Sequence, residues 1–275
     1  RTEDLADMTR EKANQALVNA MRKRGAAEVA SAARLLIDAY RKRVPAATAE
    51  VVLRTEAEAY RVQDEVFATL WPGVRAAAWK VGGPSDKVEP TAAPIPPVNL
   101  LHSPASVAGA KMQMIGVEAE VAFRLAKDLP PRSRPYSEKS VAAAVGEVLV
   151  TIELCDTRLA NWNKTSGLWK LADFQNHSAL VLGSGTKDWR KIDFLQQEVE
   201  FRIGARVAKA KGAHSFGNPF RLLPWLAAHC SKRGLGLRAG DVITTGSWTG
   251  LGIAKPGDTV SALFPGIGEA TVRIN

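Results

Sequence analysis

The sequence predicts an α+β fold in which helices come first and a mostly non-parallel set of strands follows. Residues 1 to about 70 carry apolar side chains at helical spacing, most clearly over residues 27–40. From residue 76 onward, short apolar runs alternate with links rich in proline and glycine, which is typical of strands and turns. No regular alternation of strand and helix is visible, so the pattern does not favour a parallel βαβ fold. We therefore expect a helical region over residues 1–75 and a strand-rich domain over residues 76–275.

Composition favours a globular protein over a nucleic-acid-binding, membrane-spanning or disulfide-rich one. The chain has 275 residues, of which 46% are hydrophobic and 24% charged, so it can bury a sizeable core. The net charge of +9 is not concentrated in one stripe, which favours attraction of anionic small molecules over nucleic-acid binding. No apolar run approaches the about 18 to 20 residues of a membrane span, and no secretory signal is visible. Cys155 and Cys230 have no metal-type spacing, so we expect a cytoplasmic protein without a disulfide framework.

The predicted elements follow in order along the chain. The first helix ends before a break at residues 44–50, where Thr48 is the expected N-cap of a second helix that ends before Trp71. The proline-rich residues 84–99 are expected to be loop. The remaining expectations are strands near residues 76–83, 115–128, 147–156 and 179–185, a strand pair over 196–212 turning near Gly204, helices opened by Ser137 and closed by Gly234, and a final hairpin over 259–274.

Three carboxylates lie inside the predicted strands. Glu118 and Glu120 are two residues apart, so they point to the same face of their strand. That face could be wet, which is common for alternating strands, or buried around a cation. Glu153, in the middle of another apolar run, favours an oxygen-ligand site for Mg²⁺ or Mn²⁺. Spacing alone does not establish that the two strands are neighbours.

Lys80 lies between Trp79 and Val81 in a short apolar strand that ends in glycines. Such a lysine either extends to the surface or is held near the negative charge of a site. In the second case it could position a substrate carboxylate or relay a proton.

Six stretches occur in a characteristic order: AWKVGG, IGVEAEVAFRLAKDLP, IELCDTRLANW, LADFQNHSALVLGSG, GNPFRLLPWLA and LRAGDVITTGSW. This set resembles the fumarylacetoacetate hydrolase superfamily, and most closely its branch of 2-keto-4-pentenoate hydratases and 4-oxalocrotonate decarboxylases. The resemblance runs from about residue 60 to the C-terminus. It implies a mixed β-roll with a small helical N-terminal region.

The resemblance also implies the residues of a site. Glu118, Glu120 and Glu153 match the family's ligands for Mg²⁺ or Mn²⁺, and Lys80 matches the family lysine. The residues expected to contact the substrate are Thr245, Gly246, Ser247 and Asp173.

The implied reaction belongs to the degradation of aromatic compounds. Water is added to a 2-hydroxy-2,4-dienoate by way of its keto form, and decarboxylation uses the same metal-stabilised enolate. Family members are commonly homo-oligomers. Two alternatives stay open: a hydrolase that cleaves a C–C bond of an acylpyruvate, and a non-catalytic partner subunit.

The sequence departs from the family pattern in two places. The loop after Lys80 lacks the family's acidic residue, which Asp86 or Glu89 could replace. Asn176 and His177 stand where relatives carry small hydroxyl residues. His177 is either a structural or surface residue, as a lone histidine commonly is, or a catalytic base that would suit the hydrolase.

Other polar and aromatic residues receive structural interpretations. We expect His102 and His214 at the surface, and His229 as a favourable charge near a helix C-terminus. Trp248 either caps the pocket or packs in the core. Two further residues, Asp156 and Arg158, are expected to support the site or to pair with each other.

Overall fold

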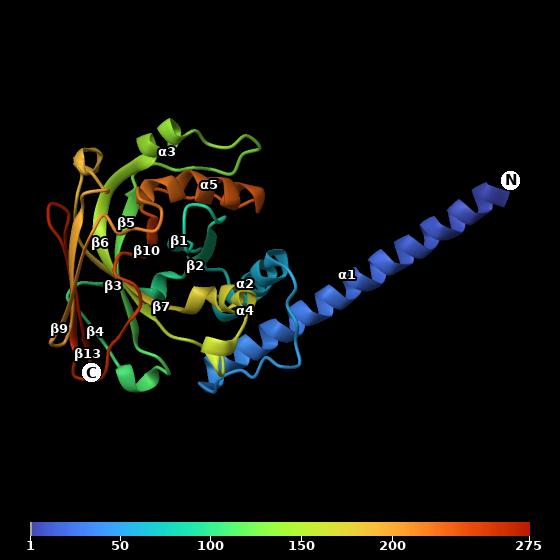
Figure 1. Ribbon diagram of the computed structural model, residues 1–275, viewed down its shortest axis with the longest axis horizontal. Helices are drawn as coiled ribbons and strands as arrows, with labels where there is room; N and C mark the ends of the chain where they lie inside the picture. The colour runs from blue at the N-terminus through green and yellow to red at the C-terminus, as the bar shows by residue number, and fades with distance from the viewer. Residues whose placement is uncertain (1) are drawn as a thin grey trace. The chain divides into compact units, whose positions relative to one another are not determined.

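The computed structural model describes the backbone of residues 2–275 and the side chains of residue 12 and residues 14–275. The chain forms two compact units, which are coloured by residue number in Figure 1. The first unit comprises Arg1–Pro72 and Arg158–Asp173, and the second comprises Gly73–Thr157 and Phe174–Asn275. Among the described residues, no helix is both long and apolar enough to cross a bilayer.

The first unit is helical. Helix α1 packs against α2, and α2 packs against α4. Buried residues at helical spacing, such as Val29, Leu36 and Ile37 on α1, form the packed face. The helices are α1 (Thr2–Lys42), α2 (Glu56–Leu70) and α4 (Gly167–Ala172), with a short 3₁₀ helix at Trp162–Lys164.

Helix α2 begins later than the sequence predicts, because Thr55 and not Thr48 is its N-cap. The Thr55 hydroxyl accepts a hydrogen bond from the backbone N–H of Glu58 at 3.2 Å, and the Glu58 carboxylate accepts one from the N–H of Thr55 at 3.3 Å. This reciprocal pair is a capping box, which needs Glu or Gln three residues after the cap. Three residues after Thr48 stands Val51, which has no such group.

Thr55→Ala is expected to destabilise the protein by about 1 kcal/mol, because the first turn of α2 loses its side-chain acceptor. Urea denaturation followed by far-ultraviolet circular dichroism measures this change. Thr48→Ala is the matched control and should leave the midpoint unchanged. Equal losses in both variants would contradict the assignment of the cap.

The second unit contains two mixed sheets (Figure 1). In spatial order, the eight-stranded sheet is formed by β2 (Thr91–Ile95), β1 (Ala78–Gly82), β10 (Val242–Ser247), β5 (Gly116–Leu125), β6 (Val145–Cys155), β7 (His177–Thr186) and β3 (Leu100–His102), with β11 (Gly252–Ile253) beside β5. The five-stranded sheet is formed by β4 (Ala105–Val107), β13 (Gly268–Ile274), β12 (Thr259–Phe264), β8 (Glu198–Ile203) and β9 (Arg206–Lys211). The helices of this unit are α3 (Glu138–Ala144) and α5 (Leu222–Lys232).

Parallel and antiparallel pairs occur together, which confirms the predicted mixed sheet system. Strand β1 is parallel to β10, whereas β5 is antiparallel to both β10 and β6. The predicted hairpins β8–β9 and β12–β13 are present, and Ser137 is the N-cap of α3. Strand β13 of the smaller sheet packs against β6 and β7 of the larger one.

One prediction about this unit is wrong. Residues 84–99 were expected to be loop because of their prolines, yet they contain β2, with Pro94 in its middle. The strand lies at the edge of the sheet, where one side of its backbone needs no ladder partner. An edge position tolerates the missing N–H of proline, so the composition of this segment does not exclude a strand.

One face of the eight-stranded sheet carries both an apolar cluster and the charged residues of interest. Alternate residues of a strand share a face, so Ala122 lies on the same side of β5 as Glu120 and Glu118. The apolar members of this face are Ala78, Ile95, Ala122, Leu149, Leu180, Leu182 and Val242, all of them buried. The carboxylates therefore lie beside buried apolar side chains.

Candidate metal centre

The register of β5 and β6 brings the three predicted carboxylates together. Glu118 lies directly opposite Glu153, and Glu120 lies opposite Thr151. Glu120 and Glu153 are each 0% exposed, while Glu118 is half-buried. The interpretation of this strand as one with a wet face is therefore wrong. Both faces of β5 are covered, since consecutive residues from Ala119 to Phe123 are all buried.

Lys80 joins this cluster from β1. Its Nζ lies 2.9 Å from Glu153 Oε2 and donates a hydrogen bond to the backbone oxygen of Gln175 at 3.0 Å. Burial alone would lower the pKa of Lys80, but the carboxylates of Glu153 and Glu118 outweigh it, and the pKa is raised. The lysine is thus held near negative charge, and its side chain is only 13% exposed.

The segment that accepts from Lys80 has an unusual backbone. Phe174, Gln175 and Asn176 all have positive φ angles, of 53°, 54° and 58°. Each non-glycine residue in this left-handed region costs about 1–2 kcal/mol, so three in a row need support from their surroundings. Gln175 supplies part of it, because its side-chain amide donates to the hydroxyl of Thr91. The turn directs the Gln175 carbonyl at the lysine.

Glu120 is held by β10. Its Oε2 accepts hydrogen bonds from the Thr244 hydroxyl and, at 3.0 Å, from the backbone N–H of Gly246. The Thr244 hydroxyl is itself 3.0 Å from that of Thr151. Gly246 has φ of 97°, a conformation that favours glycine. The other oxygen, Oε1, is buried and has no hydrogen-bond partner in the described part of the chain.

The cluster holds more negative charge than its neighbours neutralise. Burial and the adjacent Glu153 and Glu118 carboxylates raise the pKa of Glu120 well above its usual range. Burial also raises the pKa of Glu153 to about 7, although the Lys80 ammonium works against this. Three carboxylates beside one ammonium, with a buried oxygen unpartnered, fit the donor set of a hard divalent cation.

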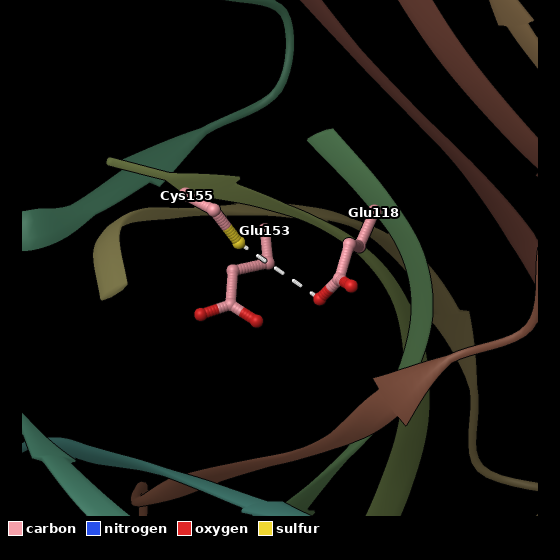
Figure 2. A group of neighbouring side chains, drawn as sticks. All are labelled: Glu118, Glu153 and Cys155. Atoms are coloured by element: carbon pink, nitrogen blue, oxygen red, sulfur yellow. Dashed lines mark hydrogen bonds between the residues drawn. The ribbon is translucent and has the colours of Figure 1, made fainter. Parts of the chain in front are cut away.

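Cys155 and His177 flank Glu153, and they are partners in the β6–β7 register. His177 is 2% exposed, and its Nδ1 lies 3.1 Å from Glu153 Oε1. Cys155 donates its thiol proton toward Glu118 Oε2 at 3.9 Å, as the dashed line in Figure 2 shows. Sequence reasoning missed Cys155 as a site residue. The available signal was its position two residues after Glu153, which places both side chains on one face.

The structure brings only part of the predicted substrate turn to the cluster. Gly246 contacts Glu120 directly, whereas Thr245 points to the other face and donates to the Val121 carbonyl at 2.6 Å. Ser247 donates to the Gly250 carbonyl at 3.0 Å and so closes its own turn. The sequence analysis missed Thr244, which contacts Glu120. Thr244 is paired with Ala122 on β5, and Ala122 lies on the same face of the sheet as Glu120 because alternate strand residues share a face.

Asp173 belongs to the other compact unit. Its buried carboxylate accepts from the backbone N–H of Arg158 at 3.0 Å and from the guanidinium Nε at 2.6 Å. The expected pairing of Asp156 with Arg158 is therefore wrong. Asp156 instead accepts hydrogen bonds from the backbone N–H groups of Gln113 and Met114, each at 3.0 Å.

The two loop acids considered as replacements for the family acid are exposed. Asp86 forms an ion pair with Arg221 at 3.4 Å, and Glu89 accepts from the indole N–H of Trp225 at 2.9 Å. Both carboxylates thus contact residues in or next to α5.

Of the histidines other than His177, one lies where it was expected and two do not behave as expected. His102 is exposed, as expected. His214 was expected at the surface but is 4% exposed, and it packs against Trp248, whose own 2% exposure shows core packing. His229 was expected to carry charge, but burial and then the charge of Arg233 lower its pKa to about 4. That imidazole is neutral near pH 7 and accepts from the Arg233 guanidinium.

His214 is expected to make the fold sensitive to mild acid. Its Nδ1 accepts from the N–H of Phe216, so its Nε2–H donates to the Thr245 carbonyl. Burial lowers the pKa of His214 below its ordinary value of 6.5. The unfolded chain therefore binds the extra proton first, and this contribution to stability, complete above about pH 6.5, is lost as the pH falls.

The melting temperature of the wild type should consequently decrease more steeply below pH 6.5 than that of His214→Gln. A glutamine can still donate to Thr245 and does not titrate. His102→Gln serves as the exposed control and should follow the wild type. Parallel curves for the wild type and His214→Gln would exclude this role.

Comparison with known proteins identifies a family and several relatives that this chain resembles. Residues 74–275 match the family described as Fumarylacetoacetate (FAA) hydrolase C-terminal. A 2-keto-4-pentenoate hydratase of Paraburkholderia xenovorans (strain LB400) is 32% identical over 174 residues, which are 63% of this chain and 60% of that protein. A 4-oxalocrotonate decarboxylase of Pseudomonas putida is 28% identical over 134 residues, 48% of this chain and 50% of that protein. The matched region thus spans only 50–60% of the length of these two relatives.

Solved structures share the fold. The 4-oxalocrotonate decarboxylase from Pseudomonas putida G7, complexed with magnesium and adipate, superimposes with a TM-score of 0.79 at 23% identity. The superposition covers 90% of this chain and 97% of that chain. With the family match extending over well more than half of its residues, the chain belongs to the fumarylacetoacetate (FAA) hydrolase C-terminal family.

Proposed function

We propose that the chain is a divalent-metal-dependent lyase, a hydratase or decarboxylase, that acts on a small 2-oxo or 2-hydroxydienoate acid. The observation that carries the proposal is the register of Glu118 opposite Glu153, with Glu120 beside them. The substrate class is supported by relatives named 2-keto-4-pentenoate hydratase, 2-hydroxyhexa-2,4-dienoate hydratase and 4-oxalocrotonate decarboxylase. The proposal includes a cytoplasmic homo-oligomer that serves aromatic-compound catabolism.

Glu118, Glu120 and Glu153 would hold Mg²⁺ or Mn²⁺. These hard cations prefer carboxylate oxygens, and the unpartnered Oε1 of Glu120 supplies one that is already desolvated. When bound, the ion supplies the positive charge that stabilises an enolate of a 2-oxo acid. The magnesium in the related decarboxylase structure supports this choice of metal.

Lys80 would bind and orient the acid. Because its pKa is raised, its ammonium stays charged and suits a substrate carboxylate better than it suits the role of a base. The apolar cluster around Ala122 and Leu149 is buried beside the carboxylates and keeps the polarity of their surroundings low, which strengthens their hold on a cation. The proton carrier proposed for this site is His177, whose ring is held by Glu153.

A second candidate is a hydrolase that cleaves an acylpyruvate C–C bond. The observation in its favour is the contact of 3.1 Å between His177 and Glu153. A histidine oriented by a carboxylate is a common base for the activation of water, which hydrolysis requires.

The two candidates are separated by one paired assay. The protein is loaded with Mg²⁺ or Mn²⁺ and incubated with 2-hydroxypenta-2,4-dienoate and, separately, with an acylpyruvate, while ultraviolet absorbance reports loss of each. Turnover of the dienoate supports the lyase, turnover of the acylpyruvate alone supports the hydrolase, and turnover of neither contradicts both and favours a non-catalytic partner subunit. Glu153→Gln should be inactive. The matched control is Glu147→Gln on the same strand, where Glu147 instead pairs with Arg124 at 3.2 Å.

A further inference from the structure

The peptide group between Thr245 and Gly246 is hydrogen-bonded to a side chain at each end. Its carbonyl oxygen accepts from His214 Nε2 at 2.7 Å, and its N–H donates to Glu120 Oε2 at 3.0 Å. The peptide is trans, so the carbonyl and the N–H point to opposite sides of the C–N bond. A single peptide group therefore joins His214 to one carboxylate of the site.

A β-bulge in β10 explains why this peptide group is available to side chains. Thr244 is paired with Ala122 and Ser247 with Glu120, so three steps along β10 correspond to two steps along β5. The extra residue of a bulge disrupts the ladder locally, and its buried backbone groups then need other partners. His214 supplies the partner of the carbonyl, and Glu120 supplies that of the N–H.

The His214 ring is held in one orientation. Its Nδ1 accepts a hydrogen bond from the backbone N–H of Phe216 at 3.2 Å, which leaves the proton on Nε2, facing Thr245. The ring lies between two aromatic neighbours, with centroid distances of 5.6 Å to Trp248 and 6.2 Å to Phe216. At 4% exposed, the residue is well shielded from water that would compete for the Thr245 carbonyl.

The orientation of the Glu120 carboxylate depends on this peptide group. Oε2 is fixed by the Thr244 hydroxyl and the Gly246 N–H, while Oε1 has no partner among the described residues. Rotation of the peptide would take the N–H away from Oε2 and turn the carbonyl dipole toward a negative charge. A hydrogen bond at the carbonyl end opposes that rotation, and it also polarises the peptide so that the N–H becomes a better donor.

We propose that His214 is a positioning residue for Glu120. By binding the Thr245 carbonyl, it keeps the Gly246 N–H on Oε2 and so fixes the direction of the oxygen that would bind the cation. The inference rests on the proposed role of Glu120 as a metal ligand. His214 acts through the peptide group and is assigned no contact with the ion or the substrate.

Mg²⁺ binding to the full chain, measured by isothermal titration calorimetry near neutral pH, tests the proposal. His214→Leu should bind Mg²⁺ about 10-fold more weakly, the lower end of the range for outer partners of a metal ligand. His214→Gln should stay close to the wild type, because the glutamine amide can still donate to Thr245. Phe216→Leu is the packing control: it trims a buried ring but keeps the backbone N–H, so it should lose stability and not affinity.

Hydrogen exchange of the Gly246 amide gives a readout that needs no metal. NMR of the protein labelled with ¹⁵N-glycine follows this amide relative to the other glycines, which corrects for changes in overall stability. Exchange should be about 5-fold faster in His214→Leu, in line with the weakening of one hydrogen bond. It should be unchanged in His214→Gln and in Phe216→Leu.

An unchanged affinity for Mg²⁺ in His214→Leu would overturn the proposal, as would an equal loss in Phe216→Leu. Should His214→Leu fail to fold, long-range ¹H–¹⁵N NMR of the wild-type imidazole decides, and a proton on Nδ1 in place of Nε2 rules the inference out. If the wild type binds no Mg²⁺, the metal assignment fails and the exchange of Gly246 alone decides for or against His214. Weaker Mg²⁺ binding in His214→Leu, with turnover of neither acid by the wild type, supports the positioning role and contradicts the lyase.

Discussion

Glu120→Gln is expected to lower the affinity for Mg²⁺ by at least about 100-fold, since even the loss of an outer partner of a metal ligand costs about 10–100-fold. The substitution keeps the shape of the side chain and removes one negative charge. The amide oxygen can still accept from Thr244 and Gly246, so the turn of β10 is preserved. What changes is the atom at the position of Oε1, where an NH₂ group that can only donate hydrogen bonds replaces a metal-binding oxygen.

The same variant should be more stable than the wild type when no metal is added. The buried Glu120 carboxylate is close to those of Glu153 and Glu118, and each of these neighbours raises its pKa. The uncharged amide removes this repulsion. A gain of about 0.5–2 kcal/mol is expected, as is common when a strained functional site is relieved.

Thermal unfolding with and without Mg²⁺ measures both effects in one experiment. The wild type should gain melting temperature on addition of Mg²⁺, because a ligand that binds only the folded state stabilises it. Glu120→Gln should start higher and gain nothing, whereas the control Glu147→Gln should behave as the wild type. A variant that is less stable without metal and still responds to Mg²⁺ would refute the assignment of Glu120 as a ligand.

Lys80→Met is expected to destabilise the metal-free protein by about 3–5 kcal/mol at neutral pH, the usual cost of removing one partner of a buried ion pair. The remaining Glu153 carboxylate is 0% exposed and would lose the cation that lies 2.9 Å away. Methionine fills most of the same volume, so the loss reports charge and not packing.

The pH dependence of this loss has a definite sign. The pKa of Glu153 is already raised from 4.5 to about 7, and removal of the ammonium raises it further. In such a case the folded state binds the proton more tightly, so stability falls as the pH rises above about 4.5. The difference between Lys80→Met and the wild type should therefore shrink as the pH is lowered toward 5, where Glu153 is neutral in both.

A double-mutant cycle separates the pair from the fold. Lys80→Met combined with Glu153→Gln should recover most of the stability that Lys80→Met loses, because no buried charge is then left without its partner. Denaturation at pH 7.5 and pH 5 supplies the free energies. If the double variant is as unstable as the sum of the single variants, the two residues are not coupled in the way that their distance indicates.

The fold and the carboxylates could be predicted from sequence because their signals are local. Alternation places Glu118 and Glu120 on one face, and Gly204 marks a hairpin, without knowledge of any other strand. The pairing of β5 with β6 is a long-range event that spacing does not encode. The resemblance therefore supplied what the pattern could not, the joint assignment of Glu153 and Lys80.

The errors have different physical causes. The burial of His214 depends on a contact with the Thr245 carbonyl, 31 residues away, which local spacing does not encode. Strand β2 pairs with the nearby β1, and it was missed because an edge position tolerates the proline that argued for a loop. Thr244 was missed in favour of Thr245 because a one-residue choice of phase decides which side chain faces the cluster. Turn motifs identify where the chain bends, but they do not give the phase of the strand that leads into them.

The left-handed turn at residues 174–176, before β7, limits which amino acids can occupy this loop. A main-chain oxygen, and not a side chain, anchors the lysine there. A residue that replaces Gln175 can therefore still offer this carbonyl to the ammonium, provided that it tolerates the φ of 54° and that the turn stays formed without the amide donor to Thr91. Proline and β-branched residues are excluded by that handedness. Backbone chirality, rather than side-chain chemistry alone, thus limits which residues can hold the lysine from this position.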